Sequence, residues 1–120
     1  MSVVYVVQSP RRRDAETGEF KPQFNLEPAA QFGEIRVLLG PEERAFDPPP
    51  VLDKLCRGLL HFVPDEDYLL LTGNPSFIGW ACAIAAEKHE YGLLQILQWQ
   101  PLQRCYSPVR AEIFTPLQAA

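Results

Sequence analysis

An unbroken apolar run that ends in Thr72-Gly73-Asn74-Pro75 constrains the fold more than any other feature of this sequence. The run Tyr68–Leu71 does not alternate with polar residues, which is typical of a central parallel strand covered on both faces. Glycine then breaks the strand, asparagine is a good helix N-cap, and proline suits the first helical position. The helix predicted over 75–90 is rich in small residues, so it should pack deeply. The segment therefore predicts a strand, a tight turn and a buried helix.

The other predicted elements complete an α/β domain. Apolar and β-branched runs predict strands over 3–8, 34–39, 67–72, 93–99 and 104–113. Helical spacing from Leu52 to Phe62 predicts an earlier helix, which Asp47 could cap and Pro64 ends. Helical connections make the strands at 34–39, 67–72 and 93–99 parallel, whereas a short turn makes the last two antiparallel. Pro108 requires the last strand to lie at an edge or to contain a bulge.

Residues 9–33 interrupt this pattern because their periodicity vanishes. The stretch is a mobile arm, an interaction segment, or the place of a short element such as a helical turn over 27–31. We therefore predict one domain over residues 1–120 with the order β-arm-β-α-β-α-β-β. Its sheet should be mixed, mostly parallel and about five-stranded, with two packed helices, like half of a Rossmann fold.

Charge and cysteine usage narrow the classes of function. A net charge of −4 argues against a protein whose whole surface binds nucleic acid. Cys56, Cys82 and Cys105 are odd in number and lack a CxxC spacing, which indicates free thiols in a reducing compartment. No apolar run approaches the ~20 residues that span a bilayer, and the first strand has no basic flank. We expect a cytoplasmic protein with no membrane contact.

The turn after the run at 68–71 is the first candidate site. In open α/β sheets, ligands bind beyond the carboxyl ends of parallel strands, where a helix N-terminus offers N–H groups to an anion. Thr72, Gly73, Asn74 and Ser76 would line such a nucleotide or phosphate site. The chain has no GxGxxG motif and no Walker lysine, and Pro75 removes one donor. A plain strand-to-helix cap is therefore the favoured interpretation.

Arg11, Arg12 and Arg13 form a second candidate, a basic arm that could contact nucleic acid or an acidic partner. Acidic residues follow directly and cancel most of this field, so a solvated loop is favoured.

The sequence supports a catalytic function less than it supports a binding function. His61 and His89 have no nearby serine or cysteine in sequence that suggests a nucleophile pair, and neither belongs to a helical metal motif. Asp65-Glu66-Asp67 precedes a strand and is interpreted as a solvated turn. We therefore identify no catalytic residue, metal ligand or cofactor, and we favour binding over enzymatic activity.

Aromatic residues supply a third candidate, a protein interface. Trp80 and Trp99 would pack in the core by default. If either is exposed beside Tyr106 or Phe114, it would mark a protein interface. The last strand could also pair with a second copy of the chain, because an edge strand carries unpaired backbone groups. A protein partner or a homo-oligomer is therefore expected.

Short pieces spread over the chain from Phe24 onward carry a resemblance. They are Phe32–Ile35, Val37–Leu39, Asp67–Leu70, Gly73–Pro75, Ala83–Ala86, Leu97–Trp99 and Tyr106–Val109. Together they resemble a family of small uncharacterised proteins encoded by tailed bacteriophages. That family usually has an aspartate at the place of Asn74 and a lysine at the place of Gln98. The resemblance implies a virus-encoded accessory protein in the bacterial cytoplasm, without implying an activity.

Overall fold

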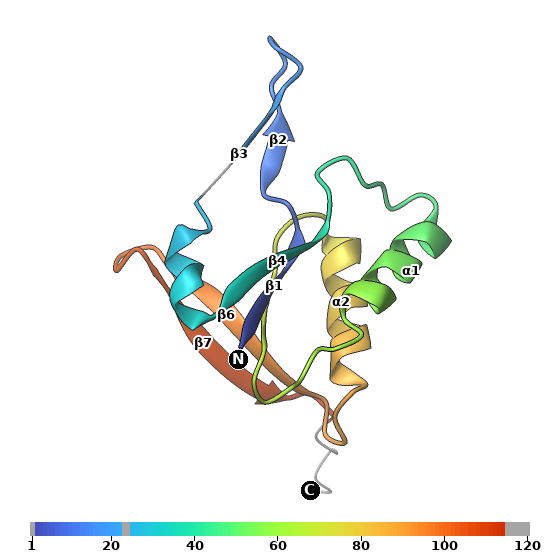
Figure 1. Cartoon of the computed structure of the whole chain (residues 1–120), viewed down its shortest axis with the longest axis vertical. Helices are drawn as coiled ribbons and strands as arrows, with labels where there is room; N and C mark the ends of the chain where they lie inside the picture. Colours follow the sequence, from blue (N-terminus) through green and yellow to red (C-terminus); the bar gives the residue numbers. More distant parts are fainter. Residues whose placement is uncertain (1, 23–24, 115–120) are drawn as a thin grey trace, which may run out of the picture.

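Five strands form one sheet in the order β4-β1-β5-β6-β7 in the computed structural model, which describes residues 2–22 and 25–114. The strands are β1 (Val3–Gln8), β4 (Glu34–Leu39), β5 (Tyr68–Leu70), β6 (Leu93–Gln100) and β7 (Cys105–Glu112). The pairs β1–β4, β1–β5 and β5–β6 are parallel, whereas β6–β7 is antiparallel. The α/β class and the single domain are confirmed, and the sheet is mixed rather than mostly parallel because β7 returns along β6 (Figure 1).

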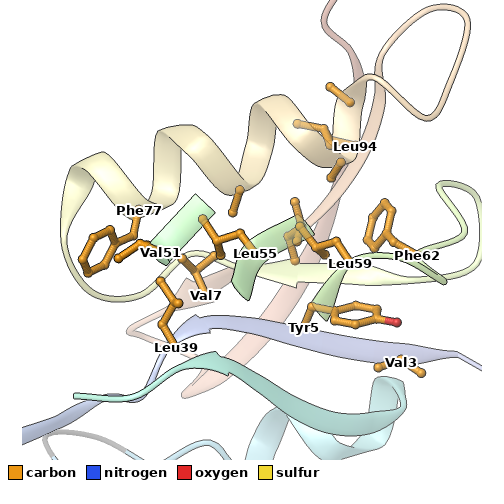
Figure 2. Packing of buried hydrophobic residues seen from close by; sticks show 14 residues of the cluster. Val3, Tyr5, Val7, Leu39, Val51, Leu55, Leu59, Phe62, Phe77 and Leu94 are labelled. Carbon is orange, nitrogen blue, oxygen red and sulfur yellow. The ribbon is translucent and has the colours of Figure 1, made fainter. Parts of the chain in front are cut away.

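Helices cover both faces of the sheet (Figure 1). The two α-helices, α1 (Pro48–Gly58) and α2 (Pro75–Ala86), pack on one face. A short 3-10 helix, η1 (Glu27–Phe32), packs on the other face. Figure 2 shows the larger of the two cores, in which side chains of β1 and β4 point toward side chains of α1 and α2. The structure thus has, besides the two predicted helices, a third helical segment at the place of the possible turn over 27–31.

Strand β1 is the centre of both cores. All six of its residues are buried, as the unbroken apolar run predicts. Because successive side chains of a strand point to opposite faces, Tyr5 and Val7 join the core under the α-helices. Val4 and Val6 join the smaller core under η1. Burial of both faces explains why this strand lacks the usual alternation of apolar and polar residues.

Residues 9–33 contain short elements. Strands β2 (Arg11–Arg13) and β3 (Phe20–Pro22) pair antiparallel and form a hairpin that stands off the body of the protein (Figure 1). Its turn closes through Gly18, whose N–H donates to the Asp14 carbonyl at 2.8 Å. The predicted helical turn is confirmed as η1, which buries Ala29 against the sheet.

Helix α1 differs from its prediction at both ends. Asp47 occupies the N-cap position but its side chain accepts no capping hydrogen bond. A cap carboxylate accepts from the N–H of the second or third helical residue, and here those residues are Pro49 and Pro50, which have none. The α-helix also ends at Gly58, before Pro64, and the chain continues through turns. Leu59 and Phe62 remain buried without being helical.

The stretch from β5 to β6 is the predicted parallel crossover, with shorter elements. Strand β5 covers only Tyr68–Leu70, and α2 ends at Ala86, well before the predicted end near residue 90. Gly92 has a left-handed φ of 66°, but it lies beyond the turns that follow α2 and is not the helix cap, which is Glu87. One face of α2 is buried through Phe77, Ala81, Ala85 and Ala86, whereas Gly79 on the other face is exposed.

Asp67 corrects the interpretation of 65–67 as a solvated turn. Its side chain is buried, with 3% exposure. One carboxylate oxygen accepts the Val3 N–H at 2.9 Å, and the other accepts the Val63 N–H at 2.8 Å. A buried carboxylate is stable only when it is hydrogen-bonded, and these two amides meet that need. Asp67 therefore connects the start of β1 to the segment that follows α1.

Strand β7 is an edge strand, which confirms the position that Pro108 requires. It pairs with β6 over all eight residues without a bulge, with Pro108 opposite Leu97. Within 2–22 and 25–114, no helix has the length and apolar character needed to cross a bilayer.

Candidate functional site at the carboxyl edge of the sheet

Strands β1 and β5 lie side by side, but the chain leaves them in opposite directions. From β1 it proceeds to β4, and from β5 it proceeds to β6 on the other side. Such a divergence between neighbouring parallel strands is where α/β sheets form ligand crevices. In this protein Gln8 fills that place. Its side-chain oxygen accepts the Asn74 N–H at 2.9 Å, and its side-chain amide donates to the Gly40 carbonyl at 3.1 Å.

The turn after β5 is fitted closely around Gln8. Thr72 is buried, and its hydroxyl donates to the Gln8 carbonyl at 2.5 Å. Gly73 has a φ of 96°, and a Cβ at this position would lie 2.2 Å from the side-chain oxygen of Gln8. Glycine is required here both by its backbone conformation and by the lack of space.

Asn74 is the predicted N-cap of α2, because its side-chain oxygen accepts the Ser76 N–H at 2.8 Å. This bond and the bond from Asn74 to Gln8 occupy two N–H groups at the helix start, and Pro75 has none. The four residues predicted to line an anion site form this turn and the start of α2. Their geometry is that of a capped helix start, with few donors left for an anion.

A cavity of about 640 Å³ lies beside this turn, on the face of the sheet that η1 covers. Its floor is formed by the ends of β5 and β6, with Leu70, Leu71 and Leu97. Thr72 also lines it, together with two residues of the segment 9–33, Asn25 and Pro28. The lining residues come from four segments that are separate in sequence, and the fold brings them together.

Trp99 and Tyr106 form the aromatic part of the cavity lining. They face each other across β6 and β7, and their rings meet edge to face with centroids 5.0 Å apart. Trp99 is 45% exposed and Tyr106 only 6% exposed, so one ring faces solvent and the other is enclosed. Burial raises the pKa of the Tyr106 hydroxyl above its ordinary value. Trp80, in contrast, packs against Phe77 and the α-helical core.

Arg104 completes the rim of the cavity, and sequence reasoning missed it. It ends the turn between β6 and β7 with a φ of 51°, the left-handed conformation. Gln8, Asn25 and Pro28 were missed as well. The only signal for Gln8 is that a polar residue ends an apolar strand, and the two others lie in the segment without periodicity.

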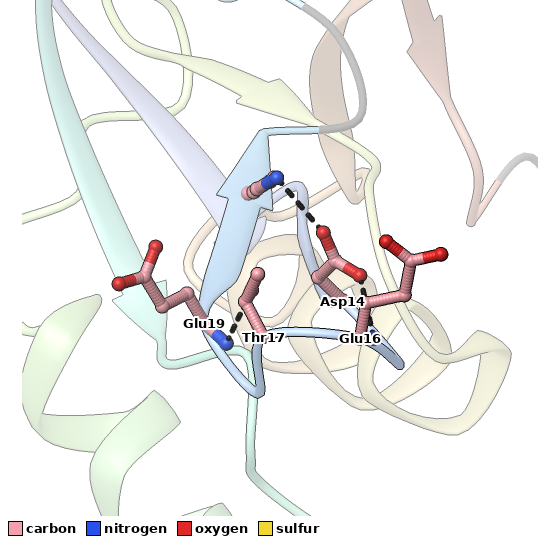
Figure 3. A network of polar contacts seen from close by, with 5 residues as sticks. Asp14, Glu16, Thr17 and Glu19 are labelled. Carbon is pink, nitrogen blue, oxygen red and sulfur yellow. Dashed lines mark hydrogen bonds and ion pairs between the residues drawn. The ribbon is translucent and has the colours of Figure 1, made fainter.

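The three arginines lie on strand β2 of the protruding hairpin. Arg11 and Arg13 are exposed. The hairpin tip is acidic and internally bonded (Figure 3): Asp14 pairs with Lys21 at 2.8 Å and accepts the Glu16 N–H, and Thr17 accepts the Glu19 N–H. The hydrogen bond from Lys21 lowers the pKa of the Asp14 carboxyl. The basic strand therefore leads directly into an acidic turn.

The remaining chemistry-bearing groups do not converge. His61 is exposed, and His89 Nδ1 accepts the Tyr91 N–H at 3.1 Å at the end of α2. Cys56, Cys82 and Cys105 are unpaired. In the described part of the chain, no three His, Cys, Asp or Glu side chains are grouped so that they could hold a metal ion.

The fold and the site define a small mixed-sheet α/β protein with an aromatic-lined cavity at the carboxyl edge of its sheet. A family model described as Phage Pam3 gp32-like protein matches residues 2–113. The chain belongs to this family of phage proteins, which confirms the resemblance drawn from its short sequence pieces. Comparison with curated proteins and with solved structures found no matching protein.

Proposed function

We propose that this phage accessory protein acts by binding a protein partner in the bacterial cytoplasm, through the hairpin of β6 and β7. The observation that carries the proposal is the half-exposed Trp99, which rests on the buried Tyr106. Tryptophan and tyrosine are enriched among the residues that dominate binding energy at protein interfaces. A tryptophan held by a neighbouring ring also loses little side-chain entropy when a partner covers it.

A second apolar group extends this surface. Leu102 lies at the tip of the same hairpin and is 94% exposed. Exposed apolar side chains that are scattered singly need no explanation, but Trp99 near the end of β6 and Leu102 in the turn that follows it place two exposed apolar groups at one end of the hairpin. Free thiols at three cysteines support a reducing compartment.

The test is affinity capture from infected bacteria with matched surface variants. Leu102→Asp should abolish recovery of the partner, because it introduces a charge into an apolar contact. Phe46→Asp is the matched control, since Phe46 is 95% exposed in the loop between β4 and α1, at the opposite edge of the sheet. Equal recovery with both variants would exclude the hairpin as the binding surface.

Self-association through β7 is the less favoured form of this proposal. An edge strand can pair with a second copy, but Pro108 removes a backbone N–H from the middle of β7. Sedimentation equilibrium measures the oligomeric state of the protein directly. A dimer that dissociates when Val109, which is 40% exposed on β7, is changed to lysine would favour self-association over a separate partner.

A nucleotide or phosphate ligand at Thr72–Ser76 is the second candidate function. It is favoured by one observation, that Thr72 lines the cavity beyond the carboxyl end of the parallel strand β5. A thermal-shift panel of nucleotides and anions tests it. A rise in Tm that Ser76→Ala abolishes would support it, whereas no rise would leave the protein-binding proposal standing.

A nucleic-acid contact through the β2–β3 hairpin is the third candidate. Exposure of Arg11 and Arg13 on a protruding element favours it. It predicts binding that weakens steeply with salt and is removed when Arg11, Arg12 and Arg13 are changed together to glutamine. Binding that is insensitive to salt would exclude it.

A further inference from the structure

The cavity at the carboxyl edge has the size and the character of a small-ligand site. Its volume of about 640 Å³ lies within the ~300–1,000 Å³ that is usual for such sites. Leu70 and Leu97, which belong to the core on this face of the sheet, give it an apolar floor, and the rings of Trp99 and Tyr106 give it flat walls. Surfaces of this kind favour a planar apolar group over a flexible polar one.

Tyr106 is a lining residue that carries a hydroxyl group. Only 6% of Tyr106 is exposed, and this burial raises the pKa of its hydroxyl. No described residue forms a hydrogen bond with this hydroxyl. Every fully buried side-chain oxygen or nitrogen of the described residues has a hydrogen-bond partner, so this hydroxyl is not fully buried. The hydroxyl must therefore open to the cavity or to solvent. At neutral pH it is protonated and can donate to a ligand oxygen.

Arg104 gives the cavity a cation at its rim. Its backbone adopts the left-handed conformation, with a φ of 51°, which is uncommon for a residue other than glycine. A left-handed residue is common at the end of a short hairpin turn, and here it leads the chain into β7. None of the described residues forms an ion pair or a hydrogen bond with the Arg104 guanidinium, which is exposed. A guanidinium in this position can bind a carboxylate or a phosphate through two parallel hydrogen bonds.

We propose that this cavity binds a planar aromatic acid. The ring lies over the leucine floor beside Trp99 and Tyr106, and the acidic group extends to Arg104 and accepts from the Tyr106 hydroxyl. The ligand class follows from the combination of flat apolar walls with a hydroxyl and a guanidinium that no residue in the described part of the chain engages. The cavity shares Trp99 and Tyr106 with the proposed partner surface, whereas Leu102 lies outside the cavity lining and so separates the tests of the two proposals.

The two tryptophans of the chain give the experiment an internal control. Trp99 lines the cavity, whereas Trp80 lies on α2 at the opposite face of the sheet. The indole N–H signals of both are followed by ¹H–¹⁵N NMR while benzoate or phenyl phosphate is added. Benzyl alcohol serves as the neutral aromatic control and cyclohexanecarboxylate as the non-aromatic acid. We expect a saturable shift of the Trp99 signal with the two aromatic acids, a fixed Trp80 signal, and weaker binding of both controls.

Variants of Arg104 and Tyr106 then test the roles of the two polar groups. Arg104→Gln should weaken the aromatic acids roughly tenfold, as expected for the loss of one charge-assisted contact, and should leave benzyl alcohol unchanged. Arg104→Gly should do the same in a backbone that glycine adopts without strain, so it separates charge from folding. Tyr106→Phe should weaken the acids by a smaller factor.

Three results would overturn the proposal: no saturable shift at Trp99, parallel shifts of both tryptophans, or an unchanged preference for acids in both Arg104 variants. Tighter binding of phenyl phosphate than of benzoate would identify a phosphate as the acid, as in a nucleotide. The reverse order would identify a carboxylate. Leu102→Asp should bind these compounds as the wild type does, so a failed cavity and a failed partner surface give different results.

Discussion

Thr72 and Gln8, which are 64 residues apart, hydrogen-bond each other twice at the carboxyl ends of β5 and β1. The Thr72 hydroxyl donates to the Gln8 carbonyl at 2.5 Å and accepts the Gln8 N–H at 3.4 Å. Strand β5 ends at Leu70, so these bonds take over where the regular ladder between the strands stops. They hold the start of the turn against β1, and the Gln8 side chain holds the start of α2.

This arrangement predicts a large difference between two glycine substitutions. Gly73→Ala should lower the free energy of unfolding by about 1–3 kcal/mol, because it adds a Cβ against Gln8 in a left-handed backbone. Gly79→Ala is the matched control. It lies in the exposed interior of α2 with open space around it, so it should raise stability by roughly 0.5–1 kcal/mol. Urea unfolding measures both, and equal effects would contradict the role of Gln8.

The two helix caps predict a second contrast. Asn74→Ala should cost about 1 kcal/mol of stability, because it removes the bond to the Ser76 N–H. Asp47→Ala should cost clearly less, since Asp47 makes no capping bond and the donors it would need are absent at Pro49 and Pro50. Thermal unfolding of the two variants compares them. A larger loss at Asp47 than at Asn74 would show that the cap assignment is wrong.

Asp67 predicts a third result. Asp67→Ala should lower the free energy of unfolding by about 2–4 kcal/mol, because it leaves the buried Val3 amide and the partly buried Val63 amide without their partner. Asp67→Asn keeps one acceptor oxygen and should lose less. Asp65→Ala, at an exposed neighbour, should stay within about 0.5 kcal/mol of the wild type. A neutral Asp67→Ala variant would refute the structural role of this carboxylate.

Tyr106 predicts a loss of stability in alkali. Burial raises its pKa in the folded protein above 10.0, its ordinary value, so the folded state holds the proton more tightly than the unfolded state does. The free energy of unfolding should therefore be unaffected below pH 10.0 and fall as the pH rises from there toward the folded pKa.

Tyr106→Phe should reduce this alkaline loss without removing it. Burial, and secondarily Asp67, also raises the pKa of Tyr5, which remains in the variant. Tyr91→Phe, at a half-exposed ring, is the control. Urea unfolding from neutral pH to strong alkali gives the profile, and identical slopes for the three proteins would exclude the mechanism.

The central part of the fold could be predicted from sequence because its signals are local. The apolar runs of β1 and β4, the Asn74 cap and the edge position of β7 each depend on a few adjacent residues. The burial of Asp67 depends on its hydrogen bond with Val3, 64 residues away, which no local pattern signals. The β2–β3 hairpin was missed for another reason: strands of three residues are too short to show periodicity.

The candidate site was predictable only in fragments. Thr72, Trp99 and Tyr106 were identified for separate reasons, one as a ligand residue and two as interface residues. The fold brings all three to one cavity. Nothing in the sequence signals Arg104 as part of that site, because an arginine after a short turn is ordinary and its left-handed backbone is visible only in three dimensions.

The central position of β1 has a consequence for how the chain is made. This strand is synthesised before both of its neighbours, and its second neighbour, β5, begins 65 positions after β1 does, at Tyr68. Until that segment leaves the ribosome, Val3–Val7 is an apolar, β-prone stretch with an unpaired side. Its early pairing with β4 leaves one edge open, so the nascent chain is most exposed to aggregation during this interval.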